Sequence, residues 1–168
     1  MFGKKKCEDS DDEEAEQRCQ QLTDSLISVT GNRIMFHSDI TARSSFLLIN
    51  AFKQAIRNIN MLDIDNPTAT PIILHINTDG GEVYKVLSII SYIRSLPYEV
   101  HTICEGCVAS AGVLLSMAGT KRFIYENAYM LVHEIRSGMW GKYSECIDDM
   151  YNNFIMKNID KFLYTINK

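Results

Sequence analysis

The feature of this sequence that most limits its fold is an alternation of short, β-branched apolar runs with longer stretches of helical periodicity. The clearest run covers residues 72–76, has the length of a strand, and is closed by the turn residues 77–81. A shorter strand is expected over residues 33–37. Because alternating strands and helices are typical of β-α-β units, the sequence predicts an α/β fold of repeated β-α-β units.

The first predicted helix follows the strand over residues 33–37 and can be capped by Asp39 or Thr41. Apolar residues recur along it at helical spacing and define one buried face. They are Leu47, Leu48, Ala51, Phe52, Ala55, Ile56 and Ile59. A second helix is expected from about Glu82 until Pro97 stops it.

The second half of the chain continues the pattern with a strand over residues 99–104. From Val108 the sequence is apolar on every side and rich in small residues, which predicts a buried helix. Short strands over residues 122–125 and 129–133 follow. A long helix is predicted from about Lys142, and its apolar residues keep nearly a heptad rhythm.

Composition supports one folded domain preceded by a tail. With 168 residues, of which 46% are hydrophobic and 23% charged, the chain has the balance of a globular protein. The net charge of -4 comes from the first 16 residues, where seven acidic residues outnumber three lysines. We therefore predict a disordered charged tail over residues 1–20 and one domain over residues 21–168.

The same observations disfavour several classes of partner. The body of the chain has balanced charge, so no basic stripe predicts binding to nucleic acid. No apolar run approaches the roughly 18 residues that a membrane span needs, and no signal-peptide segment is evident. A soluble, cytoplasmic protein is expected. The odd number of cysteines, five, favours free thiols.

Three features of the sequence suggest nucleophilic catalysis when they are taken together. Ser110 is expected just after the start of the buried helix, and alone it would be read as a small residue bonded to a helical carbonyl. Gly80 and Gly81 follow the central strand and can present bare N–H groups to an oxyanion. His133 ends a predicted strand, where a general base could serve Ser110. By contrast, we interpret His37, His75 and His101 as structural or surface residues.

These positions carry a family resemblance. Residues 106–112, Gly-Cys-Val-Ala-Ser-Ala-Gly, resemble the Gly-x-Ala-Ala-Ser-Met-Gly nucleophile motif of the Clp protease proteolytic subunit. Residues 76–81, Ile-Asn-Thr-Asp-Gly-Gly, are similar to its Ile-Asn-Ser-Pro-Gly-Gly oxyanion loop, and residues 128–133 are similar to its Met-Ile-His strand. Three motifs in the same order are far more specific than any one of them.

The resemblance implies a role for each matched residue and an assembly for the chain. Ser110 would be the nucleophile and His133 the general base, and the N–H groups of Gly81 and Ala111 would bind the oxyanion. The fold would be that of the Clp protease/crotonase superfamily, assembled as stacked rings of subunits. The substrates would be unfolded polypeptides. The resemblance implies no cofactor or metal in this chain, and ATP would be used only by a partner, an AAA-plus unfoldase.

The sequence also departs from the family pattern. Asp79 replaces a proline before the glycines, and residues 139–143 are more similar to phage-encoded relatives. The family's third triad member is an aspartate beyond the long helix, and the sequence given stops at Lys168. We therefore expect the C-terminal part of the domain to be missing and assign no triad acid. Asp148, Asp149 and Asp160 do not match its position and are expected to be solvated or ion-paired.

Two alternative functions and one alternative site stay open on the sequence alone. An acyl-CoA hydratase or isomerase could use the same fold and a two-N–H oxyanion hole. A catalytically incomplete subunit could assemble with active copies and contribute only contacts. Cys104 and Cys107 have the spacing of a metal or redox pair, but without a second pair we expect both to be buried as small hydrophobes, Cys104 at the end of a strand and Cys107 beneath the nucleophile helix.

Overall fold

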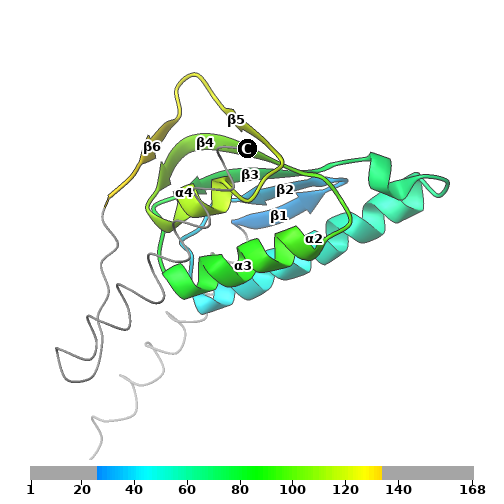
Figure 1. Cartoon of the computed structure of the whole chain (residues 1–168), viewed down its shortest axis with the longest axis horizontal. Coiled ribbons are helices and arrows are strands. Elements are labelled where there is room, and N and C mark those ends of the chain that lie inside the picture. Colours follow the sequence, from blue (N-terminus) through cyan, green and yellow to red (C-terminus); the bar gives the residue numbers. More distant parts are fainter. Residues whose placement is uncertain (1–25, 134–168) are drawn as a thin grey trace, which may run out of the picture. The chain divides into compact units, whose positions relative to one another are not determined.

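The computed structural model of the chain describes residues 26–133, so the tail predicted over residues 1–20 and the helix predicted from about residue 142 lie outside the described residues. Figure 1 shows strands and helices alternating along this range. In chain order the elements are β1 (Ile27–Thr30), β2 (Arg33–Phe36), α2 (Ala42–Leu62), η1 (Pro67–Ala69), β3 (Ile72–Thr78), α3 (Val83–Ser95), β4 (Val100–Ala109), α4 (Ala111–Ser116), β5 (Lys121–Ile124) and β6 (Tyr129–Leu131).

Within residues 26–133, six strands form one sheet in the order β1-β2-β3-β4-β5, and β6 pairs with β4 beyond the end of β5. β1 and β2 form an antiparallel hairpin, and the other pairs are parallel. Since parallel neighbours need a crossover connection, α2 links β2 to β3 and α3 links β3 to β4. The predicted α/β fold of repeated β-α-β units is confirmed.

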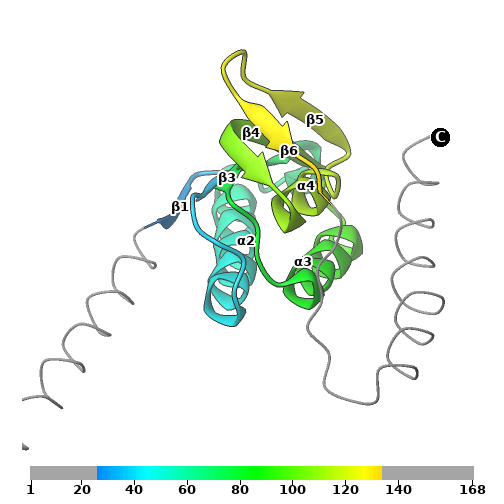
Figure 2. The same ribbon diagram turned by 90° about the vertical axis from the view of Figure 1, so that its left-hand side faces the viewer.

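The helices α2, α3 and α4 lie on one face of the sheet (Figures 1 and 2). Side chains alternate along β3, so that Leu74 and Ile76 are fully buried on the helix side. The ring of Phe52 on α2 meets that of Tyr92 on α3 edge-on, with centroids 6.1 Å apart. The core therefore lies between the sheet and its helices, and α2 buries the apolar stripe that its sequence predicts.

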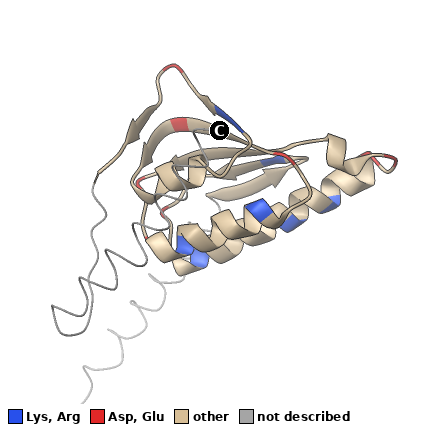
Figure 3. Cartoon of the chain, in the orientation of Figure 1, with Lys and Arg blue, Asp and Glu red and all other residues tan. Residues whose placement is uncertain are grey.

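Charged residues are spaced along the elements rather than gathered. Figure 3 shows basic residues at several places along α2 and α3 and on the strands, and an acidic band on β4. Glu105 is the acidic residue of β4. At the start of α2, the Thr41 side chain accepts a hydrogen bond from the Ser44 N–H, and the Ser44 hydroxyl accepts one from the Thr41 N–H. Thr41 is thus the N-cap, in a reciprocal capping box. No helix in residues 26–133 is long and apolar enough to cross a lipid bilayer.

The predicted start of the buried helix at Val108 is wrong. β4 continues through Ala109, and α4 begins only at Ala111 and has six residues. A run of small apolar residues fits a buried strand as well as a buried helix, because burial on both sides removes the periodicity that separates them. Gly106, at φ 64, lets the strand bend before it continues. As a result Ser110 follows the end of a central strand directly.

Candidate active site

Ser110 occupies a tight turn between β4 and α4. Its φ of 53 and ψ of -120 make it the one non-glycine residue with a positive φ among residues 26–133. An L-residue pays a steric cost for such a conformation, which persists only where its surroundings fix it. The Ser110 N–H donates to the Leu131 carbonyl at 2.8 Å, and its own carbonyl accepts from the Val113 N–H at 3.0 Å. The turn therefore holds the serine backbone between β6 and α4.

Gly80 and Gly81 form the loop that leaves the carboxyl end of β3, with φ values of 103 and 138. There is no room for a side chain on either residue. A Cβ on Gly80 would lie 2.8 Å from the Cβ of Ser110 and 3.2 Å from the Ala111 nitrogen, and one on Gly81 would overlap the carbonyl oxygen of Ile40. The glycines thus allow the loop to pass directly against the serine turn.

The orientation of the Gly81 N–H follows from its own peptide plane. The Gly80 carbonyl, in that same plane, accepts a hydrogen bond from the Ile40 N–H at 2.6 Å, and the Ile40 carbonyl accepts one from the Glu82 N–H at 2.8 Å. Because C=O and N–H point in opposite directions across a trans peptide, the Gly81 N–H is directed away from Ile40. Among the hydrogen bonds within residues 26–133, it serves as donor in none.

The Ala111 N–H is in a similar position at the first residue of α4. The first N–H groups of a helix have no intrahelical acceptor, and within the described range no other acceptor is bonded to this one. Since α4 has only six residues, few peptide dipoles add to its N-terminal field. The structure therefore brings Gly80, Ser110 and Ala111 into contact, and the roles of Gly81 and Ala111 as oxyanion donors stay predictions.

His133 lies two residues beyond β6, which ends at Leu131 and is shorter than the strand predicted over residues 129–133. β6 runs parallel to β4, and the register pairs Ala109 with Leu131. Ser110 and His133 thus follow the same ends of two neighbouring strands. The assignment of His133 as base stays a prediction, and the acidic residues Asp148, Asp149 and Asp160 lie outside the described residues.

A cleft of about 440 Å³ lies beside the carboxyl end of β3. Its walls come from the segment between β2 and α2 and from the end of β3, the strand that leads into Gly80. The lining residues are Leu26, His37, Ser38, Asp39, Thr41, Arg43, Asn77, Thr78 and Asp79. This volume is within the usual range of ligand pockets, and its lining carries charges of both signs.

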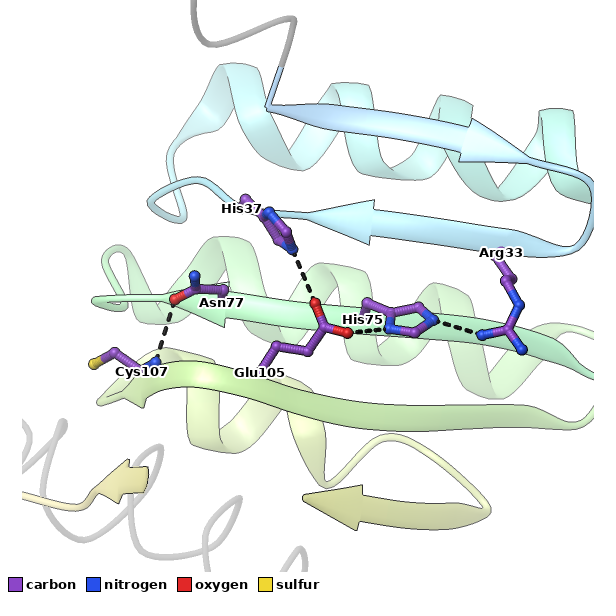
Figure 4. A network of polar contacts seen from close by, with 6 residues as sticks. All are labelled: Arg33, His37, His75, Asn77, Glu105 and Cys107. Atoms are coloured by element: carbon purple, nitrogen blue, oxygen red, sulfur yellow. Dashed lines mark hydrogen bonds and ion pairs between the residues drawn. The ribbon is translucent and has the colours of Figure 1, made fainter. Parts of the chain in front are cut away.

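A polar network crosses the face of the sheet that points away from the helices (Figure 4). The guanidinium of Arg33 lies 2.9 Å from the Nε2 atom of His75, and the Nδ1 atom of His75 lies 2.5 Å from a carboxylate oxygen of Glu105. Arginine can only donate, so Nε2 accepts and the proton is on Nδ1. His75 is buried, and its ring is held in one orientation by both neighbours.

Glu105 joins this network to two further residues. Its second carboxylate oxygen lies 3.2 Å from the Nε2 atom of His37. Burial raises the pKa of Glu105, but its hydrogen bond and charge interaction with His75, together with hydrogen bonds from Tyr125 and His37, outweigh it, so that the pKa lies below its ordinary value. This network could not be predicted from the sequence, because Arg33, His75 and Glu105 come from three separate strands and only the register brings them together.

The cysteines are placed differently from the prediction. Cys104 is buried within β4 and does not end it, and burial raises the pKa of its thiol. Cys107 does not lie beneath the nucleophile helix: it is half-buried in β4, opposite Tyr129 of β6, and its N–H donates to the Asn77 side chain at 3.3 Å. The error follows from the misplaced helix start. Within the described part of the chain, no group of three His, Cys, Asp or Glu residues could hold a metal ion.

Comparison with known proteins identifies the family of this chain. The described residues form an α/β protein in which a serine at a strand–helix turn faces a glycine loop at the carboxyl edge of a mostly parallel sheet. The sequence model of the Clp protease family matches residues 14–164. The chain belongs to the Clp protease family.

Several curated relatives are similar over part of their length. The ATP-dependent Clp protease proteolytic subunit of Bdellovibrio bacteriovorus is 38% identical over 81 residues, which are 47% of this chain and 38% of the relative. Subunit 2 of Synechococcus is 37% identical over 76 residues, 44% of this chain and 39% of the relative. Subunit 1 of Bacillus cereus is 33% identical over 99 residues, 58% of this chain and 48% of the relative. The chain thus matches less than half the length of these relatives.

Proposed function

We propose that this chain is a serine-type endopeptidase subunit that cleaves peptide bonds in unfolded polypeptides. The observation that carries the proposal is the position of Ser110, held at a positive φ between the glycine loop after β3 and the end of β6. Membership of the Clp protease family supports it, and favours a peptidase over an acyl-CoA enzyme.

In the proposed mechanism His133 accepts the hydroxyl proton of Ser110 while the serine oxygen attacks the carbonyl carbon of the peptide bond. The N–H groups of Gly81 and Ala111 then donate to the oxyanion of the tetrahedral intermediate. His133 returns the proton to the leaving amine, and an acyl-enzyme remains on Ser110. A water molecule, activated by His133, hydrolyses this ester and restores the serine.

The proposal extends to the partners of the subunit. The relatives are named ATP-dependent proteolytic subunits, which supports a working unit in which stacked rings of this chain receive polypeptide from an AAA-plus unfoldase. ATP would then be hydrolysed by the unfoldase alone. We propose a cytoplasmic site of action on the same basis.

The test is active-site labelling of the full chain in its assembled form. A fluorophosphonate is expected to label the wild-type chain, and Ser110→Ala to abolish labelling and lower peptide hydrolysis by about 10³-fold or more. Ser91→Ala is the control, because Ser91 is an exposed serine on α3, away from the glycine loop, whose hydroxyl donates to the Leu87 carbonyl. Absence of labelling in an assembled wild-type preparation would contradict the proposal and favour a subunit that contributes only contacts.

A further inference from the structure

We infer that Thr78 is a positioning residue for this reaction, whose buried hydroxyl fixes the loop that presents the Gly81 N–H to the substrate carbonyl. The inference rests on the proposed function, because it concerns the same oxyanion donors. Thr78 is the last residue of β3 and is 4% exposed. It lies outside the set of residues that the family motifs single out for chemistry.

The hydroxyl of Thr78 fixes one of the two peptide planes that flank Gly80. Thr78 Oγ1 accepts a hydrogen bond from the Gly80 N–H at 3.1 Å, in a buried position. The other plane, which contains the Gly80 carbonyl and the Gly81 N–H, is fixed by the Ile40 N–H. Thr78 thus supplies the side-chain half of a clamp whose other half is backbone. Since glycine has wide conformational freedom, both halves are needed to hold one orientation.

The methyl group of the same side chain touches the nucleophile segment. A Cβ on Gly112 would overlap the Thr78 Cγ2 atom, so this methyl fills the space that a side chain on Gly112 would take. Gly112 follows Ala111, the residue that carries the other proposed oxyanion donor. One threonine therefore contacts the segments that carry both donors, through its hydroxyl on one side and its methyl on the other.

This arrangement predicts a defect confined to the chemical step. The oxyanion forms only in the transition state, so a loosened Gly81 N–H lowers turnover more than it weakens substrate binding. A structural role alone would lower the amount of folded protein and leave the kcat of the folded fraction unchanged. A lower kcat in the folded protein with an unchanged KM therefore indicates a positioning role, whereas an unchanged kcat with less folded protein indicates a role in stability alone.

The experiment compares Thr78→Val with Thr78→Ser in the assembled full chain. Valine keeps the methyl against Gly112 and loses the hydroxyl, so kcat for a fluorogenic peptide and the rate of fluorophosphonate labelling should fall about 10- to 100-fold with KM little changed. Serine keeps the hydroxyl and should retain kcat within about threefold. Thr102→Val is the matched control, since Thr102 is also fully buried and its hydroxyl donates to the Ser116 carbonyl, at the far end of α4.

Wild-type kcat in a folded Thr78→Val variant would overturn the inference. A Thr78→Ser variant with a kcat well below wild type would overturn it too, and this arm decides the matter if the valine variant does not fold. Either result leaves labelling of the wild-type chain intact, so the failure of this inference is distinguishable from that of the proposed function. If the wild-type chain itself were not labelled, both the proposed function and this inference would be contradicted.

Discussion

Two regions of the same strands are held in place in different ways. The loops at the carboxyl ends of β3 and β4 are held by close backbone packing at glycines, whereas the helix-free face of these strands is held by hydrogen bonds between titratable side chains. The edge is fixed by lack of space, because a Cβ on Gly80 or Gly81 would meet Ser110 or Ile40. The face is fixed by hydrogen bonds among Arg33, His75 and Glu105. The first region should therefore respond to changes of shape and the second to changes of charge.

The largest effect on stability is expected when a methyl group is added to the glycine loop at the carboxyl end of β3. Gly81→Ala must both adopt a φ of 138 and displace the Ile40 carbonyl, so we expect a loss of about 3 kcal/mol in the free energy of unfolding, with peptidase activity reduced at least as much as in Thr78→Val. Urea unfolding and peptide hydrolysis measure the two effects.

Gly31→Ala is the control that separates the backbone strain of a positive φ from the steric overlap of an added Cβ. Gly31 also has a positive φ, of 59, but an added Cβ would find nothing within 4 Å. Its cost should be only about 1 kcal/mol, and activity should be unchanged. Equal losses for the two variants would show that conformation, and not space, governs the edge.

An intermediate loss of stability is expected when Glu105, at the centre of the polar network, is replaced. Glu105→Ala leaves the buried Nδ1–H of His75 without its acceptor, which should cost about 1–3 kcal/mol in unfolding free energy. Glu99→Ala is the matched control, because Glu99 lies on the exposed surface beside His101 and Lys121 and should change stability little. If both variants melt alike, the network contributes no more than a surface ion pair.

The smallest effect concerns pH. The pKa of Glu105 is lowered in the folded chain, so the ionised carboxylate stabilises the fold above its unfolded pKa of about 4.3, and this contribution is lost as the pH falls through the folded pKa. The wild type should therefore be more stable than Glu105→Gln above about pH 5, and this difference in unfolding free energy should shrink as the pH falls from about 5 to 3. Thermal melting of both chains across that range measures it, and parallel curves would contradict the assignment.

Much of the fold could be predicted because its elements have clear periods. The helical spacing of Leu48, Phe52, Ala55 and Ile59 and the β-branched run before Asn77 identified α2 and β3 from the residues alone. β1 was not predicted, since Ile27–Thr30 is short and gains its pairing only from β2. Residues 108–110 were misassigned because small apolar residues carry no period when both sides are buried.

The candidate site was predictable in part for a related reason. Its glycines and serine stand in contiguous motifs, so the order of residues was enough to find Gly80, Gly81 and Ser110. The roles of Thr78 and Ile40 could not be inferred that way. The role of Ile40 depends on its bridge to Gly81, and that of Thr78 on the contact of its methyl group with Gly112, and both of these arise only in the folded chain.

The fixed tautomer of His75 gives the sheet an internal spectroscopic reporter. Its ring proton lies in a hydrogen bond from the buried His75 ring to the partly buried Glu105 carboxylate, so it should exchange slowly with solvent and give a separate downfield proton resonance, with Nδ1 protonated and Nε2 bare in nitrogen spectra. Arg33, His75 and Glu105 belong to three adjacent strands. That single resonance would therefore monitor whether β2, β3 and β4 remain aligned during assembly or substrate processing.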